Sequence, residues 1–265
     1  MRICSLVAVA VVVSALAAPA SAGMAEDCTQ ARDPDLGIVG CTAAIRSGQW
    51  QGKELAWAYY NRGIAYFDLG EYHRAIEDYD EAIRLDPGYA FAYGNRGHTY
   101  YKLGDHHRAI QDYDQSLRLD SGNANDFNNR GNAYYALGEY RRAILDYDRA
   151  IRLDPEYAHA YNNRGLAYND LGEYRRAIEN YDRALRIDSG YGSAYQNRGV
   201  AHEFLGDYQR AARDWEQAIR IDGASRATWW QEYTKGKGHY SGVIDGIFGP
   251  ATRRALMACA VDPAC

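Results

Sequence analysis

A period of 34 residues is the feature of this sequence that most restricts its fold. The tripeptide Asn-Arg-Gly occurs five times at that spacing, and a Leu-Gly dipeptide and then an alanine follow it each time. The tripeptides begin at Asn61, Asn95, Asn129, Asn163 and Asn197. Because the five copies keep one register without an insertion, we expect a stack of similar units in which each unit contacts only its neighbours.

Each unit has the pattern of two helices joined by a tight turn. In the first unit, apolar and small residues recur at spacings of three and four on both sides of Leu69-Gly70. Glycine readily takes the left-handed conformation that ends a helix, so Leu69-Gly70 predicts the turn. Gly63 and Ala75 are small where the two helices must approach closely. A helix pair of this kind cannot bury its apolar face alone, so the pattern predicts an all-α, right-handed solenoid with a concave and a convex side.

These residues resemble the tetratricopeptide repeat (TPR), which has the same period and the same Gly, Tyr, Ala and Pro landmarks. The resemblance implies a TPR superhelical solenoid of antiparallel helix pairs, with five repeats at 56–89, 90–123, 124–157, 158–191 and 192–225. One departure is an arginine before the first glycine, where the family usually has leucine. We expect this arginine to pair with an acid of the Asp-Tyr-Asp segment, such as Asp78 or Asp80. A second departure replaces the landmark proline in three units, by Ser121, Ser189 and Gly223.

Residues 1–22 have the features of a secretory signal peptide. Arg2 precedes an apolar run, and Ala20-Ser21-Ala22 is the small-residue pattern that signal peptidase cleaves. We therefore expect an exported bacterial protein, periplasmic or secreted, with no membrane span after cleavage. The alternative is an uncleaved membrane anchor. Four cysteines would remain in an oxidising compartment, and their positions favour the disulfides Cys28–Cys41 and Cys259–Cys265 over the other pairings. A metal site is not expected, because C-x-x-C spacing and a nearby histidine are both missing.

The segment 23–55 is interpreted as an N-terminal cap that contains half a repeat. Gly37, Ile38, Cys41, Ala44 and Ile45 align with the residues that face the core in a second helix. The alignment predicts a lone helix over residues 34–46 that covers the first repeat. A Cys28–Cys41 disulfide would hold the preceding segment against this helix.

The TPR resemblance also implies a binding groove, because the first helix of each repeat lines the concave side. The asparagines Asn61, Asn95, Asn129, Asn163 and Asn197 would form a row there, similar to the asparagine ladder of O-linked N-acetylglucosamine transferases. An amide both donates and accepts, which suits an extended peptide backbone. The alternative is that each asparagine bridges neighbouring helices within the solenoid. Candidate aromatic contacts of a protein or peptide partner are Trp57, Tyr60, Phe67, Phe91, Tyr101 and Tyr135, for which ordinary packing is the alternative. A clamp for chaperone-tail carboxylates is not expected, since Lys102 is the only evident cation.

After residue 225 the repeat stops, and residues 226–265 are predicted to form a small helical module. The run from Gly242 to Leu256 is similar to the peptidoglycan-binding domain of cell-wall hydrolases. We expect Pro250 to open a helix whose inward face holds Ala255 and Leu256. The candidate peptidoglycan-binding residues are Tyr240, Asp245, Gly246, Phe248 and Thr252. The alternative is a degenerate copy that only caps the last repeat.

Charge and motif content exclude several functions. The net charge is −5, with acidic and basic residues interspersed, so nucleic-acid binding is not expected. The sequence has no nucleophile–base arrangement, no phosphate-binding loop and no paired carboxylates outside the repeat, so we predict neither an enzyme nor a cofactor. The prediction is a periplasmic TPR scaffold that binds a protein or peptide, with the C-terminal module as a candidate cell-wall tether. The alternative is an accessory or regulatory protein of a cell-wall enzyme complex, in which that module is only a structural cap.

Overall fold

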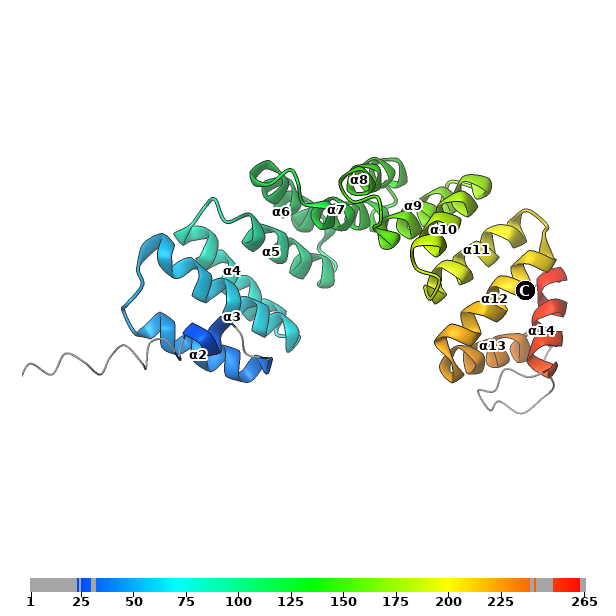
Figure 1. The fold of residues 1–265 in the computed structure, drawn as a ribbon, viewed down its shortest axis with the longest axis horizontal. Coiled ribbons are helices and arrows are strands. Elements are labelled where there is room, and N and C mark those ends of the chain that lie inside the picture. Colours follow the sequence, from blue (N-terminus) through cyan, green and yellow to red (C-terminus); the bar gives the residue numbers. More distant parts are fainter. Residues whose placement is uncertain (1–22, 24, 30–31, 239–240, 242–249, 263–265) are drawn as a thin grey trace, which may run out of the picture. The chain divides into compact units, whose positions relative to one another are not determined.

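The described part of the chain is built from helices and turns (Figure 1). The computed structural model describes residues 23, 25–29, 32–238, 241 and 250–262. The helices are α2 (Pro34–Arg46), the 3-10 helix η1 (Gly52–Leu55), α3 (Ala56–Asp68), α4 (Tyr72–Leu85), α5 (Ala90–Lys102), α6 (His106–Leu119), α7 (Ala124–Ala136), α8 (Tyr140–Leu153), α9 (Ala158–Asp170), α10 (Tyr174–Ile187), α11 (Gly192–Phe204), α12 (Tyr208–Asp222), α13 (Ala224–Gly236) and α14 (Pro250–Val261). This succession of paired helices confirms the predicted all-α TPR architecture.

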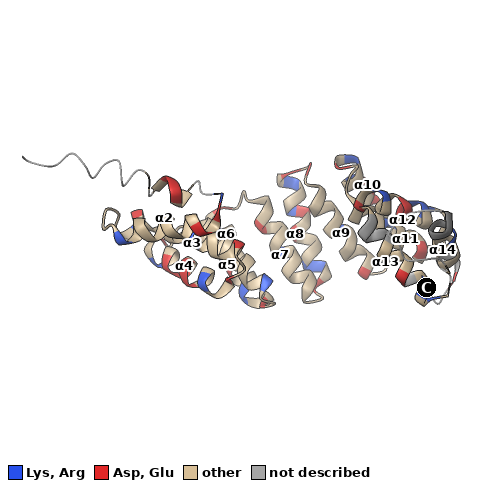
Figure 2. Cartoon of the chain, turned by 90° about the horizontal axis from the view of Figure 1, so that it is seen from below, with Lys and Arg blue, Asp and Glu red and all other residues tan. Residues whose placement is uncertain are grey.

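The chain divides into two compact units between Asp105 and His106. In the first unit, α3 packs against α4 and α2 packs against α3. In the second unit, the packed pairs are α7 with α8, α9 with α10, and α11 with α12. Basic and acidic residues are interspersed on the helices of both units (Figure 2). None of the helices described is long and apolar enough to cross a membrane.

The Leu-Gly dipeptides form the turns within the pairs. Gly70 has a φ of +76°, and the N–H of Glu71 donates to the carbonyl oxygen of Tyr66 at 2.9 Å. Gly138 repeats this arrangement in the third repeat, with a φ of +75°. Glycine takes this left-handed backbone without a steric penalty, and the backward hydrogen bond satisfies a carbonyl at the helix end. Each first helix therefore ends at a fixed residue, which places the second helix directly beside it.

The core of each unit is built from small residues on one helix and aromatic rings on the next. A Cβ atom on Gly131 of α7 would lie 2.6 Å from Cε1 of Tyr147 on α8, which is 1% exposed. The rings of Tyr147 and Tyr181 belong to one cluster together with Ala143, Ala177 and Ala201. The small residues thus let the helices approach closely, and the rings fill the remaining space.

The first unit begins with the helix expected from the alignment. Helix α2 spans Pro34–Arg46, and Ile38 packs with the core residues Tyr66, Ala75 and Tyr79. Cys28 and Cys41 form a disulfide, and Cys41 is fully buried. The disulfide therefore attaches the segment before α2 to the buried side of that helix. The expected signal peptide, residues 1–22, lies outside the described residues.

The last two helices cover the end of the last repeat. Trp230 of α13 and Leu256 of α14 pack against Trp215 and Ile219 of α12, and the two tryptophan rings lie 4.9 Å apart. Helix α14 begins at Pro250 and buries Ala255 and Leu256, as the sequence predicts. Cys259 is disulfide-bonded, whereas its predicted partner Cys265 lies outside the described residues.

Candidate functional site

In the third and fifth repeats, the arginine that precedes the first glycine connects two successive second helices. In the third repeat, Nε and Nη2 of Arg130 donate to Asp146 of α8, each at 2.7 Å. Its Nη1 donates to Asp114 of α6, the second helix of the preceding repeat. Arg198 makes the same three contacts, with Asp214 and Asp182. Burial alone would lower the pKa of both arginines, but the hydrogen bonds to their two carboxylates raise it above its ordinary value.

Both acids predicted to pair with this arginine do so, but with arginines of different repeats. Arg62 pairs with Asp78 of its own repeat, and Arg96 of the next repeat pairs with Asp80. Arg130 and Arg198 each contact a carboxylate of their own repeat and one of the repeat before. Because the arginine adjoins the asparagine in sequence, these ion pairs fix the rotation of the first helix and thereby the position of the amide.

The asparagine amides mostly connect a first helix to the first helix of the preceding repeat. Asn95 donates to the hydroxyl of Tyr60 at 3.1 Å. Asn163 donates to Asn128 at 3.0 Å and to Asn132 at 3.1 Å, and Asn197 donates to Asn162 at 3.0 Å. Asn61 differs, because it donates to the carbonyl oxygen of Trp57 within its own helix at 2.9 Å. All four of these asparagines are half-buried, so the amides that bridge neighbouring helices still reach the surface.

In the second unit, the bridges form a continuous network. Asn162 donates to Asn163, and Asn128 donates to Asn129. Asn132 also accepts a hydrogen bond from the hydroxyl of the buried Tyr147 at 2.8 Å. Both hydrogens of the Asn163 amide are used, whereas the NH2 group of Asn129 has no partner among the described residues. The network therefore locks a row of amides on α7, α9 and α11 and leaves the donors of Asn129 available.

Sequence reasoning missed three members of this network, Asn128, Asn132 and Asn162. A signal for them exists, because they lie one residue before or three residues after the asparagine of the tripeptide. Asn132 lies three residues after Asn129 and so shares its helix face, whereas Asn128 and Asn162 lie next to the row asparagines in sequence and project from the adjoining side of the helix. An amide stands at the first position only in the third to fifth repeats and at the second only in the third, so a search for residues shared by all five copies does not find them.

The aromatic candidates lie in different surroundings. Trp57 is half-buried and packs edge-to-face on Trp50, with 5.3 Å between the ring centroids. Tyr60 packs on Tyr89 at 4.9 Å, and Phe67 packs on Tyr72 at 5.4 Å. These three rings therefore already have packing partners in the first unit.

The remaining aromatic candidates differ in exposure. Phe91 is 58% exposed, and Tyr101 is half-buried near the end of α5. Tyr135 packs on Tyr140, and its hydroxyl donates to Asp170 of the next repeat at 2.5 Å. Phe91 is thus the ring of this set with most surface to offer a partner.

The peptidoglycan-binding candidates cannot be placed in the same way. Tyr240, Asp245, Gly246 and Phe248 lie outside the described residues. Thr252 lies in the first turn of α14.

Over the described ranges, His, Cys, Asp and Glu side chains do not gather in a group of three or more that could hold a metal ion.

The family of the chain follows from comparison with known sequences and structures. Tetratricopeptide repeat sequences match residues 56–89, 90–123, 158–191 and 192–225, and a TPR repeat match covers residues 131–172. The chain therefore belongs to the tetratricopeptide repeat family, whose members are generally non-catalytic scaffolds. No curated protein sequence matches it.

Solved structures agree with this assignment. A crystal structure of MamA is 30% identical, covers 66% of this chain and 96% of its own, and has a TM-score of 0.56. PilF of Pseudomonas aeruginosa, at 21% identity, covers 79% of this chain and 90% of its own with a TM-score of 0.61. YrrB, described as a TPR protein with an unusual peptide-binding site, is 24% identical, covers 68% and 91%, and has a TM-score of 0.56. The last two likenesses establish the fold alone.

Proposed function

We propose that this protein is a non-catalytic scaffold that holds an extended peptide segment of a partner protein against the first helices of its repeats. The observation that carries the proposal is the amide network on α7, α9 and α11, which ends in the available NH2 group of Asn129. Because the network fixes the side-chain rotamers before a ligand arrives, binding costs less conformational entropy. An extended backbone presents alternating carbonyl and N–H groups, which a row of amides can match. The peptide-binding site described for the similarly folded YrrB supports the same reading.

The test is a selection of peptides from a random phage-displayed library against the purified protein. The dissociation constant of a selected peptide is then measured by fluorescence anisotropy for the wild type and two variants. Asn129→Ala removes the available donors, and we expect it to weaken binding by about fivefold to tenfold, the effect of one lost hydrogen bond to a peptide group. The matched control is Gln111→Ala, which removes an exposed amide from the second helix α6. Equal affinities for Asn129→Ala and the wild type, with unchanged thermal melting, would refute the proposed face.

We also propose that the scaffold is exported to the periplasm or secreted. The signal-like residues 1–22 and the disulfide between Cys28 and Cys41 support this location. Mass spectrometry of the protein purified from bacterial cell fractions tests it. We expect a periplasmic or secreted species that begins at Gly23, and a species found only in the cytoplasm with Met1 retained would contradict export.

For the C-terminal module, the structural cap is the role that the packing supports better. Trp230 and Leu256 cover Trp215 at the end of the last repeat. A capping element covers the apolar face of a terminal repeat in this way. Sedimentation with purified peptidoglycan sacculi separates the two roles. A cap does not sediment with the wall, whereas a tether sediments and is weakened by Asp245→Ala within the peptidoglycan-binding-like motif.

A further inference from the structure

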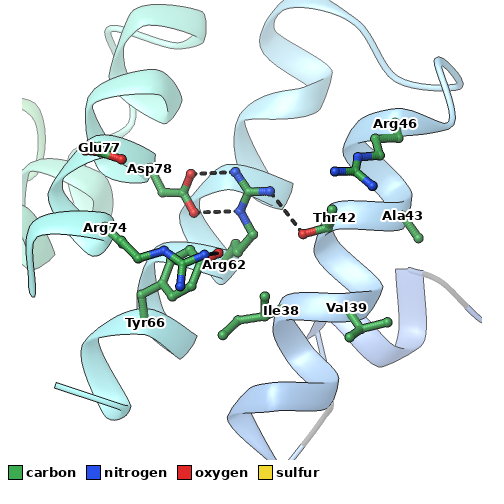
Figure 3. A pocket seen from close by; sticks show the side chains of 10 residues that line it. All are labelled: Ile38, Val39, Thr42, Ala43, Arg46, Arg62, Tyr66, Arg74, Glu77 and Asp78. Carbon is green, nitrogen blue, oxygen red and sulfur yellow. Dashed lines mark hydrogen bonds and ion pairs between the residues drawn. The ribbon is translucent and has the colours of Figure 1, made fainter. Parts of the chain in front are cut away.

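A cavity of about 780 Å³ opens between α2 and α4 in the first unit, with α3 as its floor (Figure 3). Arg62 and Tyr66 of α3 lie at its base, Ile38, Thr42 and Arg46 come from α2, and Arg74 comes from α4. None of these residues belongs to the amide row or to its aromatic neighbours. The cavity is therefore separate from the proposed peptide-binding face.

The last repeat has a cavity at the corresponding place. The side chains around Arg198 in that cavity differ from those around Arg62 in the first repeat. A cavity of about 370 Å³ lies over Arg198, between Asp182 of α10 and Asp214 of α12. Arg62 and Asp78 hold the positions of Arg198 and Asp214, and Thr42 holds that of Asp182. A neutral hydroxyl thus stands in the first unit where the last repeat supplies a carboxylate.

This exchange changes what surrounds the guanidinium of Arg62. Two of its nitrogens donate to Asp78 at 2.7 Å each, as in the other repeats, but Nη1 donates to the hydroxyl of Thr42 at 3.1 Å. Arg130 and Arg198 each hold a second carboxylate at that nitrogen. The side chain of Arg62 is only 18% exposed, so a second negative charge placed there would be poorly screened by water.

Two further arginines border the cavity. Figure 3 shows the guanidinium of Arg46 on the side of α2 that faces Arg62, and Arg46 has no ion-pair partner among the described residues. Arg74 lies flat on the ring of Tyr66, 4.0 Å from its centroid, and pairs with Glu71 at 2.6 Å. An incoming anion can therefore pair with Arg46 without displacing a carboxylate of the protein, whereas pairing with Arg74 would compete with Glu71.

The rim of the cavity on α2 is apolar. Val39 is 66% exposed, and Ile38 is half-buried beside it. A small inorganic anion would leave these side chains in water, whereas a peptide with an apolar residue next to its acid would cover them. The arginines inside the cavity and the apolar side chains at its rim together favour a peptide segment that carries an acidic residue next to an apolar one.

We propose that this cavity binds an Asp or Glu side chain of an acidic peptide segment of a partner protein, with an apolar neighbour against Ile38 and Val39. The carboxylate takes the position that Asp182 occupies in the last repeat and accepts from Nη1 of Arg62. Arg46 adds a second donor. The partner thereby completes, in the first repeat, the two-carboxylate arrangement that Arg130 and Arg198 have within the chain.

The experiment follows the arginine Nε–Hε signals by NMR while N-acetyl-Leu-Glu-Leu-amide is added to the purified protein. We expect the signal of Arg62 to move and that of Arg198, which already holds two carboxylates, to stay. The same peptide with Gln in place of Glu, and sodium acetate, are the two comparison ligands. The proposal requires that both move the Arg62 signal less than the acidic peptide does.

Two variants at one position make the test specific. Thr42→Asp supplies the missing carboxylate from within the chain and should weaken peptide binding by about tenfold or more, because the site is then filled and of like charge. Thr42→Asn introduces a side chain of nearly the same shape as Thr42→Asp but without the charge. This variant should bind the peptide within about twofold of the wild type. Circular dichroism establishes that both variants are folded. An Arg62 signal that the acidic peptide does not move, a response to acetate as large as to the peptide, or equal binding by the two variants would each overturn the proposal.

Discussion

Removing the same arginine from two adjacent repeats should have clearly different effects on stability. Arg130 in the third repeat pairs with Asp146, whose side chain is 5% exposed, and with the half-exposed Asp114. Arg164 in the fourth repeat pairs with Asp148, 31% exposed, and donates to the neutral amide of Asn180 instead of a buried acid. The substitution to Met keeps an unbranched apolar stem at each site and removes only the guanidinium.

The structure sets the size of the two effects. Arg130→Met removes both hydrogen bonds from the buried carboxylate of Asp146 and leaves it only the distant Arg149 at 4.0 Å. Breaking a buried pair typically costs about 3–5 kcal/mol, and the remaining cation places this loss at about 3 kcal/mol. Arg164→Met removes the donor to Oδ1 of Asn180, whose NH2 group keeps its bond to the carbonyl oxygen of Arg176 at 2.8 Å, so the cost is about 1–2 kcal/mol. We therefore expect Arg130→Met to be less stable than Arg164→Met by about 1–2 kcal/mol.

Guanidinium chloride denaturation followed by circular dichroism at pH 7 measures the difference, and hydrogen exchange localises it. Exchange should accelerate most in α7 and α8 of Arg130→Met, because stability in repeat proteins is largely the sum of local terms. Equal losses of stability in the two variants would refute the assignment of a buried charge pair.

Three further predictions concern the packing of the helices, the disulfide and the half-buried His98. Gly131→Ala places a methyl group 2.6 Å from the ring of Tyr147, so overpacking of about 1–3 kcal/mol should outweigh the gain of about 1 kcal/mol in helix propensity and lower the melting temperature. Replacing both Cys28 and Cys41 with Ala should destabilise the first unit by about 3 kcal/mol, and reduction with dithiothreitol should have the same effect on the wild type. Burial, with a smaller contribution from a nearby lysine, lowers the pKa of His98 below its usual value, so its stabilising contribution is complete above about pH 6.5 and falls as the pH drops through that value. His98→Gln should therefore lose less stability than the wild type between pH 7 and pH 5 in thermal melts.

The sequence predicts what the repeats share, because the shared residues perform the same packing task in each copy. The spacing of glycine, alanine and tyrosine is sufficient to predict the helix pairs and the turns at Gly70 and Gly138. It does not show which carboxylate of a neighbouring repeat Arg62 or Arg96 reaches, since that depends on how two repeats stack.

Residues that differ between copies show where the pattern alone is insufficient. The hydroxyl of Tyr181 is buried without a hydrogen-bond partner among the described residues, because Leu166 stands where Asn132 accepts from the hydroxyl of Tyr147 in the preceding repeat. The distinction between an amide that bridges helices and one that faces a ligand depends on side-chain contacts, which the 34-residue period does not specify. The row of asparagines could therefore be located from sequence, whereas its network could not.

The position of Thr42 was within reach of the sequence. The alignment of α2 with a second helix places it where Asp80 lies in the first repeat. Its significance appears only when the guanidinium of Arg62 is seen to donate to it in place of a carboxylate.

The central claim is that a partner peptide lies on the amide row of the first helices. The most direct measurement is the NMR signals of the asparagine and glutamine side-chain NH2 groups during titration with a selected peptide. We predict that the signal of Asn129 shifts most, that those of Asn163 and Asn197 shift with it, and that Gln111 on the second helix α6 does not respond. A peptide that binds while the Asn129 signal stays in place and the Gln111 signal moves would contradict the account.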